Sequence, residues 1–179
     1  MANSKLSLIN NALILIGDVP LTSLTSGTRA QVVATSLYDN IIDNELSKHR
    51  WGFARNVAQL SKDAAAPVGN EWQTSYTLPA DMLVLIKLDP SIPYQIINNK
   101  VYCNYSVTLF WDYIRKPSEA DWPAYFAKMI EYALGMDFAP SIRDSATSME
   151  LLANQYLNAS RMARYTDSQQ HPQTAIQDR

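Results

Sequence analysis

Few residues of this chain have the type and spacing that catalysis or metal binding needs. The chain contains two histidines, His49 and His171, and one cysteine, Cys103. The histidines lie far apart in the sequence, and neither has a His or Cys neighbour at the spacing of zinc ligands. Cys103 lies in a strand-like segment with apolar neighbours, which favours a buried core residue over a reactive thiolate. We therefore expect no catalytic residue, no metal ion and no cofactor.

The carboxylates and glycines show no catalytic pattern either. Asp39 and Asp43 share one helix face, where a solvated surface explains them better than an acid–base pair. The five glycines are scattered and form no phosphate-binding loop. A small-molecule enzyme built on the β-rich middle of the chain remains a rival function, but the sequence names no catalytic group for it.

The segment Lys48–Arg55 mixes cations with aromatic residues and allows two interpretations. It reads Lys-His-Arg-Trp-Gly-Phe-Ala-Arg, and such a segment can stack on the bases of a nucleic acid. It can instead be a cationic helix end, followed by Trp51 and Phe53 as anchors in the core. We favour the anchors, because the chain has 15 basic and 17 acidic residues and nucleic-acid binders need a clustered basic surface. Nucleic-acid binding through this segment stays the alternative function.

Tyrosine and tryptophan gather between Tyr94 and Tyr113. The intervening members of this group are Tyr102, Tyr105 and Trp111. They form either the core of a small sheet or a protein contact surface, because both residue types combine a large apolar area with a polar group. Both interpretations stay open at this point.

The hydrophobic pattern predicts the elements that must position these residues. Apolar residues at helical spacing predict four helices, and the fourth carries a stripe of mostly small residues that is typical of close helix packing. The expected helices are Ser4–Ile16, Thr28–Lys48, a third with Pro123 in its first turn that ends at Pro140, and Ile142–Tyr165.

Between the second and third helices, β-branched and aromatic residues predict antiparallel strands. Asn98 and Asn99 separate two strand-like runs and predict a two-residue hairpin turn, because Asn tolerates a positive φ. The expected strands are Tyr76–Leu78, Leu83–Leu88, Tyr94–Ile97, Val101–Tyr105 and Val107–Arg115.

These elements predict a predominantly helical α+β fold, a bundle of about four helices with a small antiparallel β insert between the second and third. We expect a helical domain over residues 1–56 and 117–165, a β insert over 57–116, and a flexible polar tail over 166–179. The single cysteine permits no internal disulfide. No apolar run approaches the roughly 18 residues of a membrane span, so we expect no membrane contact.

Four short segments follow one another in a characteristic order. Asn10–Leu24 ends a helix in Ile-Gly and continues with an acidic residue, Pro and Ser-Leu, and His49–Ala54 contains Trp-x-Phe. Tyr76–Leu83 reads Tyr-Thr-Leu-Pro-Ala-Asp-Met-Leu, and Tyr113–Phe126 leads into the third helix. This order resembles the tail tubular protein A family, the head-to-tail adaptors of short-tailed bacteriophages, over about residues 6–165. One departure is the Arg before the Trp, where the family has Gly or Pro.

The resemblance implies a non-enzymatic virion protein at the head–tail junction, made in the host cytoplasm during assembly. Such adaptors form a ring, usually of twelve subunits, that docks beneath the portal protein. The ring links the portal to the tail nozzle, a tail tubular protein B-like protein, and serves genome retention and ejection. Double-stranded DNA passes through its lumen without sequence-specific binding. A near-neutral chain suits such a channel, because a basic lining would hold the DNA.

The resemblance also suggests where three interaction surfaces lie. The subunit interface is expected on the fourth helix, at Met149, Ala153, Tyr156, Ser160 and Ala163. The tail-nozzle interface is expected at Tyr94, Asn98, Asn99 and Tyr102. The portal interface is expected at Tyr165, Gln170, His171, Pro172, Ile176 and Arg179.

Overall fold

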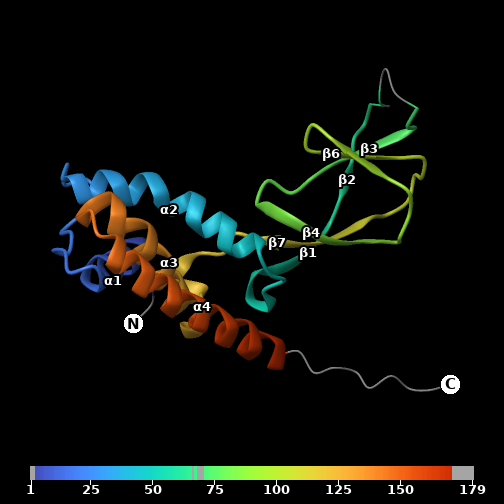
Figure 1. The fold of residues 1–179 in the computed structure, drawn as a ribbon. Coiled ribbons are helices and arrows are strands. Elements are labelled where there is room, and N and C mark those ends of the chain that lie inside the picture. The colour runs from blue at the N-terminus through green and yellow to red at the C-terminus, as the bar shows by residue number, and fades with distance from the viewer. Residues whose placement is uncertain (1–2, 66, 68–70, 171–179) are drawn as a thin grey trace. The chain divides into compact units, whose positions relative to one another are not determined.

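The computed structural model describes residues 3–65, 67 and 71–170, and it divides the chain into two compact units. The helical unit consists of Met1–Phe53 and Pro117–Arg179, and the β unit consists of Ala54–Lys116. The β unit is therefore an insertion, because the chain leaves the helical unit once and returns to it once (Figure 1).

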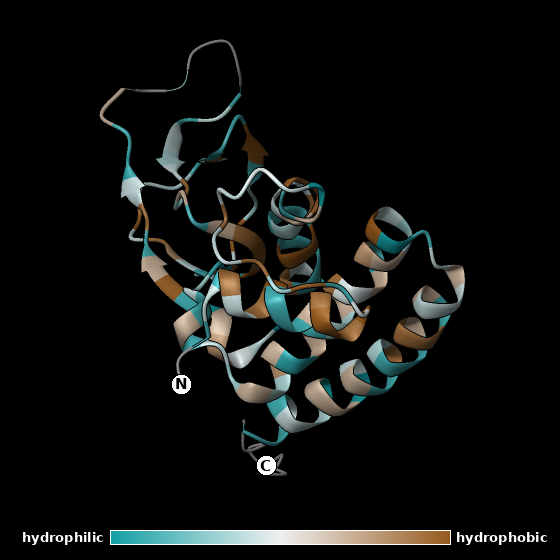
Figure 2. Cartoon of the chain, turned by 90° about the vertical axis from the view of Figure 1, so that its left-hand side faces the viewer, coloured by the Kyte–Doolittle hydropathy of each residue, from teal (hydrophilic) through white to brown (hydrophobic). Residues whose placement is uncertain are grey.

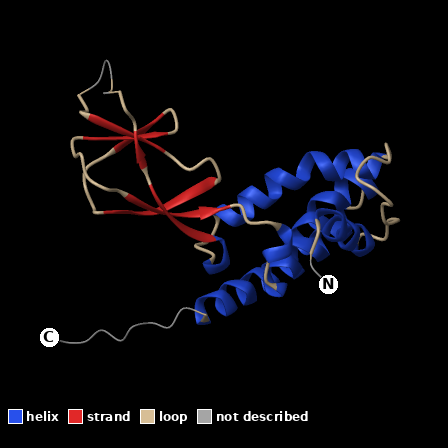
Figure 3. Ribbon diagram, turned by 180° about the vertical axis from the view of Figure 1, so that it is seen from behind, coloured by secondary structure: helices blue, strands red, loops and turns tan. Residues whose placement is uncertain are grey.

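The prediction of a predominantly helical bundle with a small insert is wrong. The described residues form four α-helices and seven strands in two antiparallel sheets, so the fold is a mixed α+β fold with substantial sheet (Figure 3). The prediction missed the first two strands, β1 (Arg55–Gln59) and β2 (Ser61–Lys62). Val57 is their only β-branched residue, and they form through pairing with distant strands, which local propensity does not report.

The first two helices lie within one residue of their predicted bounds. α1 (Lys5–Leu15) and α2 (Arg29–Ser47) begin after Ser4 and Thr28, whose hydroxyl oxygens accept hydrogen bonds from backbone amides of the first turn. After α1, Gly17 adopts a φ of 74°. This left-handed conformation favours glycine and ends the helix as the sequence predicted.

The boundary between the last two helices differs from the prediction. Pro140 was expected to end the third helix, but α3 (Ala124–Arg143) continues past it until Asp144 takes a φ of 52°. One missing amide near a helix end is tolerated here because the preceding turn is fixed by packing, with Phe138 fully buried. α4 (Ala146–Gln169) begins after its Ser145 cap rather than at Ile142.

α4 also extends beyond its predicted end. The flexible tail was expected to begin at Thr166, but the helix continues to Gln169. The reason is the burial of Asp167, which continues the inward face of the helix after Ala163. A polar sequence alone does not reveal this, because the carboxylate is held by partners from elsewhere in the chain.

The core of the helical unit is built around α3, which contacts each of the other three described helices. Hydrophobic and hydrophilic segments alternate along the helices, which gives each an apolar side (Figure 2). Burying one large apolar side chain stabilises the folded state by about 1.5–3 kcal/mol. The most buried large side chains of this core include Leu8, Ile9, Leu13, Ile42, Leu46, Phe126 and Phe138.

The β unit contains two sheets, and every described pairing in them is antiparallel. One sheet has the order β1-β7-β4 and the other has the order β2-β3-β6-β5. The remaining strands are β3 (Thr74–Thr77), β4 (Met82–Asp89), β5 (Gln95–Ile97), β6 (Lys100–Cys103) and β7 (Phe110–Arg115). Two 3-10 helices, η1 (Gly52–Ala54) and η2 (Glu119–Asp121), lie next to the two points where the chain passes between the units.

Strands of both sheets contribute to one apolar core of the β unit. Its largest fully buried side chains are Trp111, Tyr113 and Tyr76, and Cys103 is buried beside them. The Tyr76 hydroxyl donates to the carbonyl oxygen of Val107 at 2.7 Å, so its polar end is satisfied inside the core.

The turn between β5 and β6 confirms the predicted two-residue hairpin. Asn98 and Asn99 have φ values of 48° and 59°, as a type I′ turn requires. Asn99→Val should lower the stability of the β unit by about 1–2 kcal/mol, because a β-branched side chain is strained at positive φ. Asn99→Gly is the matched control and should leave the stability unchanged or slightly raised in urea unfolding. Equal stabilities of the two variants would contradict the turn assignment.

Candidate assembly surfaces

The aromatic residues of Lys48–Arg55 are core anchors. Trp51 is 1% exposed, and its indole N–H donates to the carbonyl oxygen of Glu45 at 3.0 Å. Its ring centroid lies 5.0 Å from that of Phe126 in α3, and the ring of Phe53 lies 4.8 Å from the same residue. A buried ring cannot stack on a base, so this geometry argues against a nucleic-acid platform.

The cations of the same segment are largely engaged by carboxylates of the chain. The Lys48 ammonium lies 2.6 Å from a carboxylate oxygen of Glu45. Arg55 forms a two-pronged pair with Asp112, at 2.8 and 2.6 Å. Arg50 is exposed. The segment therefore does not provide the clustered free positive charge that phosphate binding uses.

A buried carboxylate near the end of α4 holds the segment that leaves the helical unit. Asp167 is 2% exposed, and its two oxygens accept the backbone N–H of Gly52 at 3.1 and 3.2 Å. The Tyr125 hydroxyl donates to the same carboxylate at 2.9 Å. Burial, together with this hydrogen bond, raises the pKa of Tyr125, so its hydroxyl stays protonated. The contact joins α3, α4 and η1.

Removing this carboxylate should destabilise the helical unit. Asp167→Ala leaves the Gly52 amide and the Tyr125 hydroxyl without their acceptor, which costs about 2–3 kcal/mol. Ser168→Ala changes the exposed neighbour and should alter stability by less than about 0.5 kcal/mol. The free energy of unfolding in urea, followed by far-UV circular dichroism, checks both values. A wild-type free energy of unfolding in Asp167→Ala would show that the contact does not contribute to stability.

His49 lies half-buried beside the same carboxylate. Its Nε2 atom is 3.5 Å from an Asp167 oxygen, and its ring meets the Trp51 ring edge-on. Burial lowers the pKa of His49 and the charge of Arg164 lowers it further, while Asp167 opposes both. The folded state therefore binds a proton less readily than the unfolded state does.

The lowered pKa of His49 predicts a loss of stability in mild acid. As the pH falls through about 6.5, the usual pKa of histidine, the unfolded chain gains a proton that the folded chain resists. The free energy of unfolding should fall between about pH 7.5 and pH 5.5, and His49→Gln should reduce this fall. A wild-type slope in His49→Gln would contradict the assignment.

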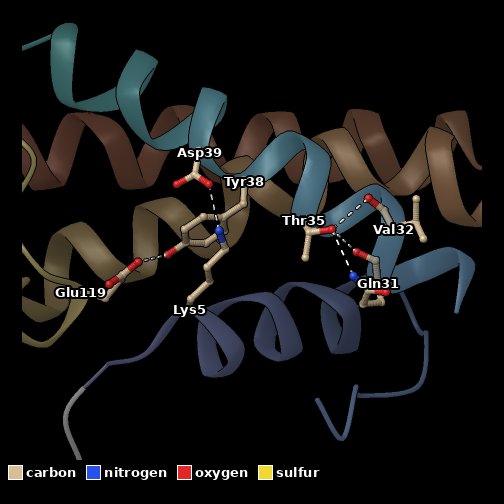
Figure 4. A network of polar contacts seen from close by, with 7 residues as sticks. All are labelled: Lys5, Gln31, Val32, Thr35, Tyr38, Asp39 and Glu119. Carbon is tan, nitrogen blue, oxygen red and sulfur yellow. Dashed lines mark hydrogen bonds and ion pairs between the residues drawn. The ribbon is translucent and has the colours of Figure 1, made fainter. Parts of the chain in front are cut away.

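A third polar contact fixes the segment that returns to the helical unit (Figure 4). The buried Tyr38 hydroxyl of α2 donates to a carboxylate oxygen of Glu119 in η2, at 3.2 Å. The Lys5 ammonium lies 2.9 Å from Asp39 and 4.5 Å from the centre of the Tyr38 ring. Burial and the neighbouring Glu119 charge raise the pKa of Tyr38, which keeps it a hydrogen-bond donor.

Most of the residues expected to form a subunit interface face the inside of their own helical unit. Ser160 and Ala163 are buried, and the Tyr156 hydroxyl donates to Glu45 of α2 at 2.7 Å. Ala153 is half-buried and Met149 is partly exposed. The small side chains allow α4 to approach α3 closely within one chain.

The opposite face of α4 exposes large apolar side chains. Leu151, Met162 and Tyr165 are 62%, 63% and 62% exposed. Leu151 and Met162 are eleven residues apart, three turns of an α-helix, and lie on one line along it. This outward face is the best candidate for a contact surface on the helical unit, and the predicted stripe on the other side did not reveal it.

The residues expected to meet a tail nozzle lie around the β5–β6 hairpin. Asn98 and Asn99 form its turn, and Tyr102 is half-buried in β6. Tyr94 is 37% exposed, and its ring packs edge-on against Trp111 with centroids 5.9 Å apart. The tyrosine and tryptophan group is thus partly core and partly surface.

The residues expected to meet a portal are described only in part. Tyr165 and Gln170 are exposed at the end of α4. His171, Pro172, Ile176 and Arg179 lie outside the described residues.

An open pocket of about 550 Å³ in the β unit is lined by residues that include Lys62, Tyr76 and Ser106. Across residues 3–65, 67 and 71–170 no cluster of His, Cys, Asp and Glu is arranged to hold a metal ion. None of the described helices is long and apolar enough to cross a membrane.

A comparison of the chain with protein-family models found no match, and a comparison with curated proteins found none either. The functional conclusion therefore depends on the segments of the sequence and on the geometry described above.

Proposed function

We propose that this chain is a structural virion protein, a head-to-tail adaptor. In this proposal its copies form a ring that docks beneath a portal protein, links it to a tail nozzle, and surrounds part of the DNA channel. The protein acts at the head–tail junction of the virion and performs no catalysis.

The observation that carries the proposal is the place of the adaptor-like segments in the fold. The first, Asn10–Leu24, spans the end of α1 and its Gly17 turn, and the second, His49–Ala54, holds the chain where it leaves the helical unit. Tyr76–Leu83 joins β3 to β4, and Tyr113–Phe126 spans the return from β7 into α3. Short apolar motifs occur by chance in any core. These four, however, follow one another in the order expected for the adaptor family, and each lies where one element of the fold leads into the next.

The charge of the chain supports a channel through which DNA moves. The formal net charge is −2, and within Lys48–Arg55 the Lys48 and Arg55 side chains are paired with carboxylates. A ring of such subunits exerts little attraction on phosphates, so DNA can pass without being retained by the wall.

The two ends of the proposed adaptor use different parts of the chain. The exposed β5–β6 hairpin, with Asn98, Asn99 and Tyr94, faces the nozzle protein in this proposal. In this proposal the segment after Gln170 contacts the portal protein. The residues before it belong to α4, which packs within the helical unit. A segment that is polar and lies at the end of a helix is a common docking device.

Truncation after Gln170 tests the proposal. The variant lacking residues 171–179 should unfold at the wild-type temperature, because Asp167 and the whole of α4 remain. It should fail to join rings of the portal protein encoded in the same genome, as judged by negative-stain imaging and analytical ultracentrifugation.

The matched control replaces residues 171–179 by a Gly/Ser segment of equal length, and it should fail in the same way. Portal rings that bind both variants as well as wild type would remove the assigned role of this segment. A wild-type chain that never joins portal rings would overturn the adaptor function itself.

A further inference from the structure

The pocket of about 550 Å³ in the β unit lies between two segments that are far apart in the sequence. Residues 59–62, at the end of β1 and in β2, form one wall, and residues 106–108, between β6 and β7, form the other. The lining includes Leu60 and Tyr76, which are buried, and most of its polar side chains are exposed. The pocket therefore combines apolar side chains with polar groups that solvent can reach.

Hydrogen bonds hold both walls of this pocket in place. The Tyr76 hydroxyl donates to the carbonyl oxygen of Val107 at 2.7 Å, and Tyr76 is also the antiparallel partner of Lys62 in the β2–β3 ladder. The backbone N–H of Leu60 donates to the carbonyl oxygen of Leu109 at 2.8 Å. The same tyrosine therefore positions both walls, and a ligand does not have to order them on binding.

The charge of the lining selects the kind of ligand. Among the described residues that line the pocket, Lys62 is the one cation and there is no carboxylate. The Lys62 ammonium donates to the Ser106 hydroxyl oxygen at 2.7 Å, which joins the two walls. An ammonium has three N–H donors, and a neutral hydroxyl oxygen balances none of its charge. The pocket is thus suited to a ligand with negative charge.

We propose that this pocket binds a carboxylate group carried on a short apolar stem. One carboxylate oxygen accepts from the Lys62 ammonium, and the other accepts from the Ser106 hydroxyl, whose hydrogen is available while its oxygen accepts from Lys62. The stem lies against Leu60 and Val107. A carboxylate matches the single positive charge of one lysine, whereas a phosphate ester carries about −1.5 to −2 at pH 7 and would remain partly unpaired.

This inference goes beyond the proposed adaptor function and does not depend on it. The lining includes β2, and β2 and β5 are the opposite edges of their sheet. The site is therefore separate from the β5–β6 hairpin that the proposed function assigns to the nozzle protein. Two sources can supply the same chemistry, a free short-chain organic acid and the side chain of an acidic residue in another protein.

An NMR titration of the full-length, ¹⁵N-labelled chain with butyrate at pH 7 and constant ionic strength tests the site. The backbone amides of residues 60–62 and 106–108 should shift and saturate. Butyramide has nearly the same shape but no charge, and it should produce no saturable shift of these amides.

A pair of lysine variants tests the assigned contact. Lys62→Gln should weaken butyrate binding by about tenfold or more, because a charge-assisted hydrogen bond is lost. Lys87→Gln is the matched control, because it removes another exposed lysine of the β unit, on β4, and it should bind butyrate as the wild type does. The spectrum of each variant also shows whether it has folded.

The peptide acetyl-Gly-Glu-Gly-amide distinguishes the two sources. Shifts of the same amides at lower concentrations than butyrate needs would identify an acidic side chain of a protein as the occupant. Shifts with butyrate but not with the peptide would identify a free organic acid. The site is overturned by a lack of saturable shifts with either probe, by equal binding of butyramide, or by wild-type affinity in Lys62→Gln.

Discussion

The ring of Phe126 contacts aromatic residues from both segments that connect the two units of the chain. Trp51 precedes the point where the chain leaves the helical unit, and Trp122 follows the point where it returns. Their ring centroids lie 5.0 and 5.1 Å from that of Phe126, and both pairs meet edge-on. Each indole N–H also donates to a backbone carbonyl, Trp51 to Glu45 and Trp122 to Pro117. α3 therefore fixes both connections by contacts with the same side chain.

Hydrogen bonds hold the same two connecting segments that the aromatic rings contact. Asp167 holds the outgoing backbone at Gly52, and Tyr38 holds the returning segment at Glu119. Hydrogen bonds are directional, so they fix the position of each segment more narrowly than apolar packing does. The last turns of α4 belong to this arrangement, which explains why a helix with a polar sequence persists up to Gln169.

The sequence predicted best those features that depend on neighbouring residues. α1, α2 and the Asn98–Asn99 turn follow from caps, helical periodicity and the backbone preference of asparagine. β1, the end of α4 and the place of Pro140 depend on residues more than 50 positions away or on packing, and local patterns do not contain that information. The buried role of Asp167 had one sequence signal, its position four residues after Ala163 on the inward face.

The candidate surfaces also include features that local sequence patterns predicted and features that only the structure revealed. Periodicity correctly identified a packing face of α4, but it cannot tell whether that face meets the same chain or another one. The exposed Leu151 and Met162 could be assigned to the surface only after Ser160 and Ala163 were found in the interior. The cationic and aromatic residues at Lys48–Arg55 likewise needed their partners Glu45, Asp112 and Phe126 before the core interpretation was favoured over the nucleic-acid one.

The insertion of the β unit also sets an order for folding during synthesis. A ribosome adds roughly 5–20 residues per second, and domains generally fold as units. The β unit is complete once Lys116 has emerged, whereas α1 and α2 must wait for α3 and α4 to supply their core. The contact between Gly52 and Asp167 spans 115 residues, so it closes only after Asp167 has emerged. The nascent chain therefore carries a finished β unit while the apolar faces of its first two helices are still without their final cover.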